Sequence, residues 1–188
     1  VAAAASRSLT SAEALAGLVP GCASYRSAEE VAGVCDMVFI TGPDDAIGPI
    51  ASSISWRPGQ GVVHCSGVAS LDVLATARRQ GALRGALHPL QTFSSVEDAV
   101  KTLPGATFAI EADAEMRPYL EGIALDLGGV PIFLRPEDKP LYHASVVMMG
   151  GLLTGLAGAV ADLWRQFGID SDQALKSLVP IIRGNATT

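Results

Sequence analysis

The chain has 188 residues, of which 49% are hydrophobic and only 17% are charged. This composition excludes a disordered protein and is typical of a well-buried α/β or α protein. The net charge of −6, with no cluster of Lys and Arg, argues against nucleic acid as the main partner.

The three cysteines give no sign of a metal site or a disulfide framework. Cys22, Cys35 and Cys65 lack the spacing of metal ligands, and an odd number does not suit paired disulfides. The segment 1–5 has neither the basic region nor the length of a secretory signal. We therefore expect a cytoplasmic protein without a bound metal.

Strands and helices alternate along the first 134 residues. Apolar runs predict strands at 1–5, 37–41, 61–64, 83–87, 107–110 and 130–134. Capping boxes begin at Thr10, Ser27 and Ser94 and predict helices that end near residues 18, 34 and 103. A cap at Ser70 predicts a further helix that ends near residue 80. Further helices are expected at 46–54 and 114–127. This alternation predicts a parallel sheet.

From residue 136 onward only helical patterns remain, at about 139–167 and 171–182. We therefore predict an α/β domain over 1–136 and a helical domain over 137–188. The segment 144–161 has no charged side chain and is just long enough to span a bilayer. Its glycines recur at a spacing that lets helices pack closely, so we expect a helix buried in a core or a dimer interface rather than a membrane span.

Polar residues follow four of the predicted strands, and His88 is the most informative of them. Pro89 restricts His88 to an extended conformation at the end of its strand. The other ends carry Ser6-Arg7-Ser8, Thr41-Gly42-Pro43-Asp44 and His64-Cys65-Ser66-Gly67. Parallel strands would gather these ends at one edge, where such sheets bind ligands. The alternative is that turns simply favour small polar residues.

Ser6-Arg7-Ser8 suggests which ligand this is. In dinucleotide-binding folds an acidic residue at this strand end selects NAD, whereas an arginine accommodates the 2′-phosphate of NADP. Two hydroxyls beside a guanidinium suit a phosphate, although a solvated arginine is the simpler alternative. No GxGxxG turn occurs in the chain. We therefore expect that a first strand and its glycine turn precede Val1, with a gap between the strands at 1–5 and 37–41.

A second group of reactive side chains lies at the predicted domain boundary. Lys139, Tyr142 and His143 are possible proton donors, and helical spacing allows Lys139 to share a face with either of the other two. The alternative is a charged helix start with His143 packed inside.

The sequence His88-Pro89-Leu90-Gln91-Thr92-Phe93 together with 138–144 (DKPLYHA) resembles a family of oxidoreductases that join a Rossmann-like NADP-binding domain to a helical domain of unknown function. The turns at 41–47 and 64–67 resemble those of the same family. The resemblance implies distant kinship with pyrroline-5-carboxylate reductase, prephenate dehydrogenase and 6-phosphogluconate dehydrogenase-like enzymes. It also implies a homodimer formed through the helical domain. Two departures are Gly151, where the family often has asparagine, and an end at Thr188 where the family's domain continues.

These observations predict an NADP-dependent oxidoreductase that transfers a hydride to or from a small carbonyl, imine or hydroxy compound. Ser6, Arg7 and Ser8 would hold the 2′-phosphate, and Thr41, Pro43, Asp44 and Ser66 would line the dinucleotide cleft. His88 or Lys139 would move the proton, with Tyr142 and His143 as second candidates. The alternatives are a non-catalytic dimeric NADP(H)-binding sensor or scaffold, and a membrane-associated helix-pairing protein.

Overall fold

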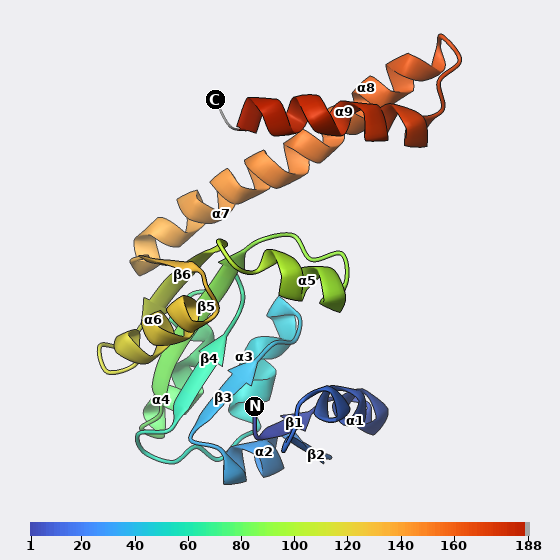
Figure 1. Ribbon diagram of the computed structural model, residues 1–188. Coiled ribbons are helices and arrows are strands. Elements are labelled where there is room, and N and C mark those ends of the chain that lie inside the picture. The colour runs from blue at the N-terminus through green and yellow to red at the C-terminus, as the bar shows by residue number, and fades with distance from the viewer. Residues whose placement is uncertain (187–188) are drawn as a thin grey trace. The chain divides into compact units, whose positions relative to one another are not determined.

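The computed structural model describes residues 1–186, which form seven strands and a series of helices (Figure 1). The strands are β1 (Ala3–Ala5), β2 (Ala23–Tyr25), β3 (Met37–Ile40), β4 (Gly61–His64), β5 (Leu83–Leu90), β6 (Thr107–Ala112) and β7 (Val130–Phe133). The helices between them are α1 (Leu9–Leu18), α2 (Ala28–Val34), α3 (Asp44–Ser52), η1 (Leu71–Leu74), α4 (Ala75–Arg79), α5 (Val96–Thr102) and α6 (Arg117–Asp126). The short turn η2 (Pro136–Asp138) then leads to α7 (Lys139–Val147), η3 (Met148–Leu152), α8 (Leu153–Arg165) and α9 (Ser171–Ala186).

The chain divides into two compact units, Val1–Lys139 and Pro140–Thr188. The first unit holds all the strands of the described residues, and the second is helical. The predicted fold class, an α/β Rossmann-like domain followed by a helical region, is confirmed. The division falls three residues after the predicted domain boundary at residue 136.

Five strands of the first unit form one sheet in the order β3-β4-β5-β6-β7. Strands β3, β4 and β5 are parallel, and their register aligns Ile40 with His64 and His64 with Ala86. Strand β6 runs antiparallel to β5, and β7 is parallel to β6. The sheet is therefore mostly parallel, as predicted, with a reversal between β5 and β6 that the alternating pattern did not predict.

The reversal explains the position of α5. Leu90 pairs with Thr107, so the chain leaves β5 and re-enters β6 at the same edge of the sheet. A helix that connects parallel strands must cross the sheet and bury an apolar face on it. Helix α5 buries no residue, and Val96 and Val100 are exposed. It belongs to a long hairpin connection and not to a crossover.

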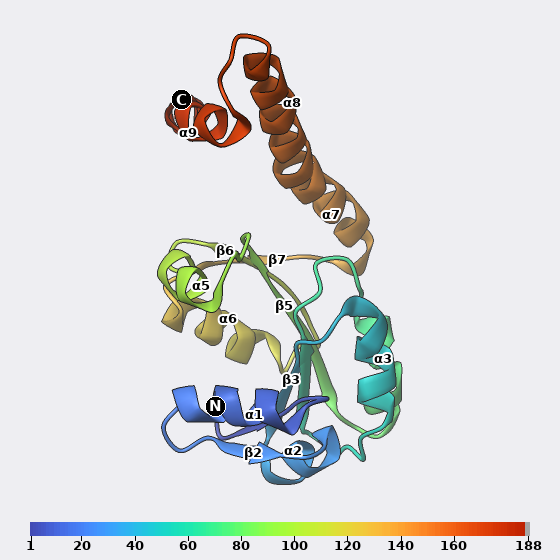
Figure 2. The ribbon, with the colours of Figure 1, turned by 90° about the vertical axis from the view of Figure 1, so that its right-hand side faces the viewer.

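Helices cover both faces of this sheet (Figure 2). Side chains of successive residues in a strand point to opposite faces. Val62 accordingly packs with α3, η1 and α4 on one face, while Val63 packs with α6 on the other. Ala86 and Leu87 divide between the same two faces. The apolar run of β4, and that of β5 which Arg84 and Gly85 interrupt, follow from this burial on both sides.

Strands β1 and β2 form a separate parallel pair. Within residues 1–186 no backbone ladder joins β1 to β3, so the predicted gap between these two strands is present. Strand β2 was not predicted, because Ala23-Ser24-Tyr25 is short and lacks an apolar run.

The second unit consists of a long helical segment followed by α9. The segment 136–165 is long and apolar enough to cross a membrane by length and composition, and only 6% of its most apolar window is buried. Leu152 and Leu156 are 64% and 62% exposed. Its apolar side chains are therefore not buried in a core among the described residues. Helices α8 and α9 meet through the buried small residues Ala161 and Ala174.

Candidate functional site

The carboxyl ends of β3, β4 and β5 lie side by side, because these strands are parallel and in register. Thr41, Pro43 and Asp44 follow β3 and are exposed. Ser66 follows β4 and is buried, and His88 lies near the carboxyl end of β5 and is half-buried. The structure thus brings together the predicted residues of these three strand ends, at the edge where such sheets bind ligands.

The connection after β4 is a tight turn built on Ser66. The Ser66 hydroxyl accepts hydrogen bonds from the backbone N–H groups of Val68 and Ala69, at 3.2 and 3.0 Å. The backbone N–H of Ser66 donates to Nδ1 of His64 at 3.2 Å. This turn, together with the residues up to Leu71, is called here the β4 loop (residues 65–71). The hydroxyl of Ser66 therefore shapes the loop.

The imidazole of His88 packs directly on this loop. A Cβ atom added to Gly67 would lie 2.8 Å from both Cε1 and Nε2 of His88. Real Cβ atoms do not approach other heavy atoms so closely, so the ring occupies the space that any other residue at position 67 would fill. Gly67 is thus required for the present position of the His88 ring.

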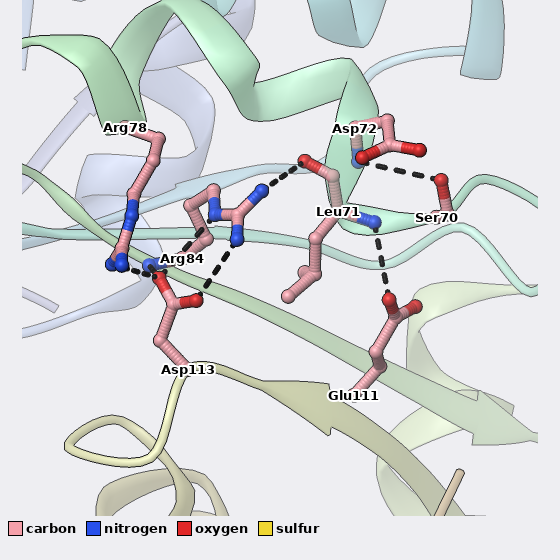
Figure 3. Close-up of polar contacts among 7 residues, drawn as sticks. All are labelled: Ser70, Leu71, Asp72, Arg78, Arg84, Glu111 and Asp113. Atoms are coloured by element: carbon pink, nitrogen blue, oxygen red, sulfur yellow. Dashed lines mark hydrogen bonds and ion pairs between the residues drawn. The ribbon is translucent and has the colours of Figure 1, made fainter. Parts of the chain in front are cut away.

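Lys139 lies next to the β4 loop, but it is only 3% exposed and its charge is paired with Glu111. Its Nζ lies 3.1 Å from Oε2 of Glu111 and donates a hydrogen bond to the backbone carbonyl of Ala69. Oε1 of Glu111 accepts from the backbone N–H of Leu71 at 3.4 Å (Figure 3). The register of the strands places Ala86 between His64 and Glu111 in one row across the sheet.

Burial governs the electrostatics of this cluster. Burial first and the charge of Lys139 second lower the pKa of His64 to about 4, against the smaller raising effects of a backbone hydrogen bond at Ser70 and of the charge of Asp44. Burial also lowers the pKa of Lys139, against the raising effects of Glu111 and Asp44. His64 is therefore neutral at pH 7. Burial raises the pKa of Cys65 to about 11, which keeps its thiol protonated and excludes a nucleophilic role at neutral pH.

A second ionic group supports the β4 loop from the other end of β5. Arg84 donates to both carboxylate oxygens of Asp113, and its NH1 donates to the backbone carbonyl of Leu71 at 3.3 Å (Figure 3). Arg78 also pairs with Asp113. Burial raises the pKa of Asp113, but the hydrogen bonds and charges of the two arginines outweigh it, so the net pKa is lowered.

Ser6, Arg7 and Ser8 form the connection between β1 and α1, and all three are exposed. Within residues 1–186 the Arg7 guanidinium has no ion pair or hydrogen bond. Ser8 occupies the N-cap position of α1, yet its hydroxyl makes no capping bond. The segment therefore presents a guanidinium and uncommitted hydroxyls at the N-terminus of a ten-residue helix, a chemistry that suits an anion.

Tyr142 and His143 belong to the second unit, one turn along the helix that begins at Lys139. Gly151 lies in the π-helical turn η3, and a Cβ there would meet only Val147 at 3.8 Å. The backbone at position 151 therefore has room for a side chain. Turns of this kind are frequent at functional sites.

The sequence reasoning missed Glu111, and it noted His64 only as part of a polar strand end, without a role of its own. Glu111 is the one charged residue in a mostly apolar strand, which is a usable signal for a paired buried charge. His64 ends a strand whose residues are all buried. The partners of both come from distant parts of the chain, so their interactions could not be anticipated from local patterns.

Two family models match the chain. Residues 1–89 match the Rossmann-like domain, and residues 106–188 match a domain of unknown function (DUF2520). No curated protein matches the sequence.

Solved structures share the fold at low sequence identity. Protein TM1727 from Thermotoga maritima is 24% identical, with a TM-score of 0.75, over 97% of this chain and 69% of that one. The 1-pyrroline-5-carboxylate reductase from Streptococcus pyogenes is 15% identical, with a TM-score of 0.73, over 98% and 68% of the two chains. A reductive aminase from Aspergillus terreus in complex with NADPH and ethyl levulinate is 17% identical, with a TM-score of 0.73, over 98% and 65%.

Proposed function

We propose that this chain, which joins a Rossmann-like domain to a domain of unknown function (DUF2520), is an NADP-dependent oxidoreductase. It would transfer a hydride to or from a small carbonyl, imine or hydroxy compound. Structures of similar fold include a reductase that acts on pyrroline-5-carboxylate and a reductive aminase that binds NADPH. The observation that carries the choice of cofactor is the exposed Arg7 between two serine hydroxyls.

The residues at the strand ends fit this cofactor. Arg7, Ser6 and Ser8 offer a cation and hydroxyls to a 2′-phosphate. The exposed residues after β3 (Thr41, Pro43 and Asp44) and the β4 loop with Ser66 would line the dinucleotide cleft. In this assignment Ser66 acts mainly by shaping the loop, because its hydroxyl already accepts two backbone hydrogen bonds.

The cofactor would donate or accept the hydride, and the protein would orient the reactants and donate or accept the accompanying proton. We assign the proton to His88, because it is half-buried at the end of β5 whereas Lys139 is committed to Glu111 and to the Ala69 carbonyl. Tyr142 and His143 are the second candidates. The substrate would lie against His88, away from the 2′-phosphate group.

One observation favours a second candidate function, a dimeric NADP(H)-binding sensor or scaffold without turnover. Gly151 stands where the family that the sequence resembles often has asparagine, and its backbone has room for a side chain, so this chain lacks a polar group that the resemblance would lead one to expect. NADPH binding without hydride transfer to any member of a panel of carbonyls and imines would support this alternative over the enzyme.

The cofactor assignment is tested by titrating the full-length protein with NADPH and NADH. We expect a clear preference for NADPH, and Arg7→Ala should weaken NADPH binding by about tenfold or more, because a hydrogen-bonded ion pair to phosphate is lost. The affinity for NADH should be unchanged. Arg79→Ala, which removes an exposed arginine on α4, is the matched control. Equal affinities of the unmodified protein for the two cofactors would contradict the assignment.

A further inference from the structure

We propose that Glu111 and Lys139 act as positioning residues: as a pair they hold the β4 loop, and the loop in turn fixes the imidazole of His88. We call the Glu111–Lys139 pair, with its bonds to the β4 loop, the clamp. Its geometry is independent of the proposed function, and only its consequence for hydride transfer rests on that function.

The first step is the burial of the pair. The side chains of Glu111 and Lys139 are each only 4% exposed. Two charges removed from water are tolerated only when they meet each other and further hydrogen-bonding groups. Those further groups are the carbonyl of Ala69 and the N–H of Leu71, on either side of Ser70. The remaining bonds of the pair thus go to the backbone of one loop.

The second step is that Leu71 is held through both of its peptide groups. Its N–H donates to Glu111, and its carbonyl accepts from Arg84, whose guanidinium is fixed by Asp113 (Figure 3). Leu71 is also 8% exposed and contributes to the core under η1. The far end of the β4 loop is therefore anchored to β5 and β6 by charged side chains.

The third step carries this constraint to Gly67. The near end of the loop is fixed by the bond from Ser66 N–H to His64, and its interior by the bonds from Val68 and Ala69 to the Ser66 hydroxyl. Gly67 lies inside this turn. With both ends and the interior bonded, the Cα of Gly67 has a defined position.

The fourth step links Gly67 to His88. The His88 ring fills the space beside the Gly67 Cα so closely that a Cβ would approach its Cε1 and Nε2 to 2.8 Å. Any movement of the loop toward β5 would therefore displace the ring, and any movement away would release it. In this way Glu111 and Lys139 control the orientation of His88 without approaching a reacting atom.

The test removes both charges together in the full chain. Lys139→Met alone would leave a buried carboxylate without its partner, so the double variant Glu111→Leu/Lys139→Met is preferred, because paired apolar replacements of buried ion pairs are well tolerated. The matched control is Glu115→Leu/Lys176→Met, which makes the same changes at exposed positions. If the double variant does not fold, Glu111→Gln is used in its place, because it removes the negative charge and keeps the shape of the side chain.

Two measurements that need no cofactor test whether the pair holds the loop and the His88 ring. We expect amide hydrogen exchange over residues 66–71 to become about tenfold faster or more in the variant, because the Ala69 carbonyl and the Leu71 N–H lose their partners and the loop opens more easily. The chain has only three histidines, so their ring signals can be followed individually by NMR. The His88 signal should move or broaden, while that of His143 should stay in place.

A folded variant that keeps the exchange rates of the unmodified protein in the loop, or an unchanged His88 signal, would overturn the proposal. If the unmodified protein turns over NADPH, the variant should also show a lower kcat, and a higher Kd for NADPH because the β4 loop lines the proposed dinucleotide cleft. Failure of the unmodified protein to bind NADPH would refute the proposed function but not the clamp, which the exchange and NMR experiments judge separately.

Discussion

His64 shows at the scale of a single residue how burial becomes a dependence of stability on pH. Its side chain is fully buried, and the pKa is lowered from 6.5 to about 4 by burial first and by Lys139 second. Between these pH values the unfolded chain binds a proton that the folded protein does not. The stability contributed by neutral His64 is therefore present above pH 6.5 and is lost as the pH falls toward 4.

We expect this residue to lower the free energy of unfolding by about 3 kcal/mol between pH 7 and pH 4. Urea denaturation at several pH values measures this change, and His64→Leu should make the dependence correspondingly flatter. Other carboxylates titrate in the same range, so the difference between the two slopes is the informative quantity. Parallel slopes in the two proteins would mean that His64 is not buried in the neutral state.

The same residue scale shows what the sequence predicts about position. His88 and Ser66 lie at the ends of β5 and β4, as predicted, because a strand end followed by proline, or by small polar residues, is a local signal. The partner of Lys139 was not identified, because Glu111 reaches it only once β6 pairs with β5 in the folded sheet. Residue types and their spacing thus predict which edge of the sheet is polar, but not which of its charges are already paired.

At the scale of elements, two capping boxes of similar sequence have different outcomes. Ser27 caps α2, accepting from the N–H of Glu30 while the Glu30 carboxylate accepts from the Ser27 N–H. The box predicted at Thr10 is absent, because α1 already begins at Leu9 with Ser8 as its N-cap. A capping motif is informative only if the chain before it is not already helical.

These two sites give a matched pair of substitutions. Ser27→Ala should lower the free energy of unfolding by about 1 kcal/mol, because a backbone N–H loses its cap. Thr10→Ala should have little effect or stabilise slightly, since alanine is the better residue inside a helix. Urea denaturation of both variants measures the difference. An equal loss in the two would show that Thr10 does cap α1 in solution.

Apart from β2, the strands were well predicted, because burial on both faces leaves a continuous apolar run in β3 and mostly apolar runs in β4 and β5. The sequence predicted less well whether neighbouring strands run parallel or antiparallel. The segment of α5 has a capping serine, so alternation alone indicated a crossover and a parallel β6. What distinguishes the hairpin is that α5 has no apolar face buried on the sheet, and this becomes visible only in the folded chain.

At the scale of the whole molecule, the helical unit exposes several large apolar side chains along one segment. Met148, Met149, Leu152 and Leu156 are each more than 60% exposed along one helical segment. Contiguous apolar patches of this kind mark interaction surfaces. We propose that a second copy of the chain covers this segment, in line with the homodimer that the sequence resemblance implies.

The unmodified protein should therefore have the mass of a dimer in light scattering. Leu156→Glu should shift it to monomer, because a carboxylate buried without a partner in an apolar interface costs several kcal/mol. The side chain is 62% exposed in the single chain, so the substitution should leave the fold of the protomer intact. Leu18→Glu on α1, at a position 71% exposed in the other unit, is the control and should remain dimeric. A monomeric unmodified protein that partitions into detergent would instead support the membrane-associated alternative, since the segment 136–165 has the length and composition for it.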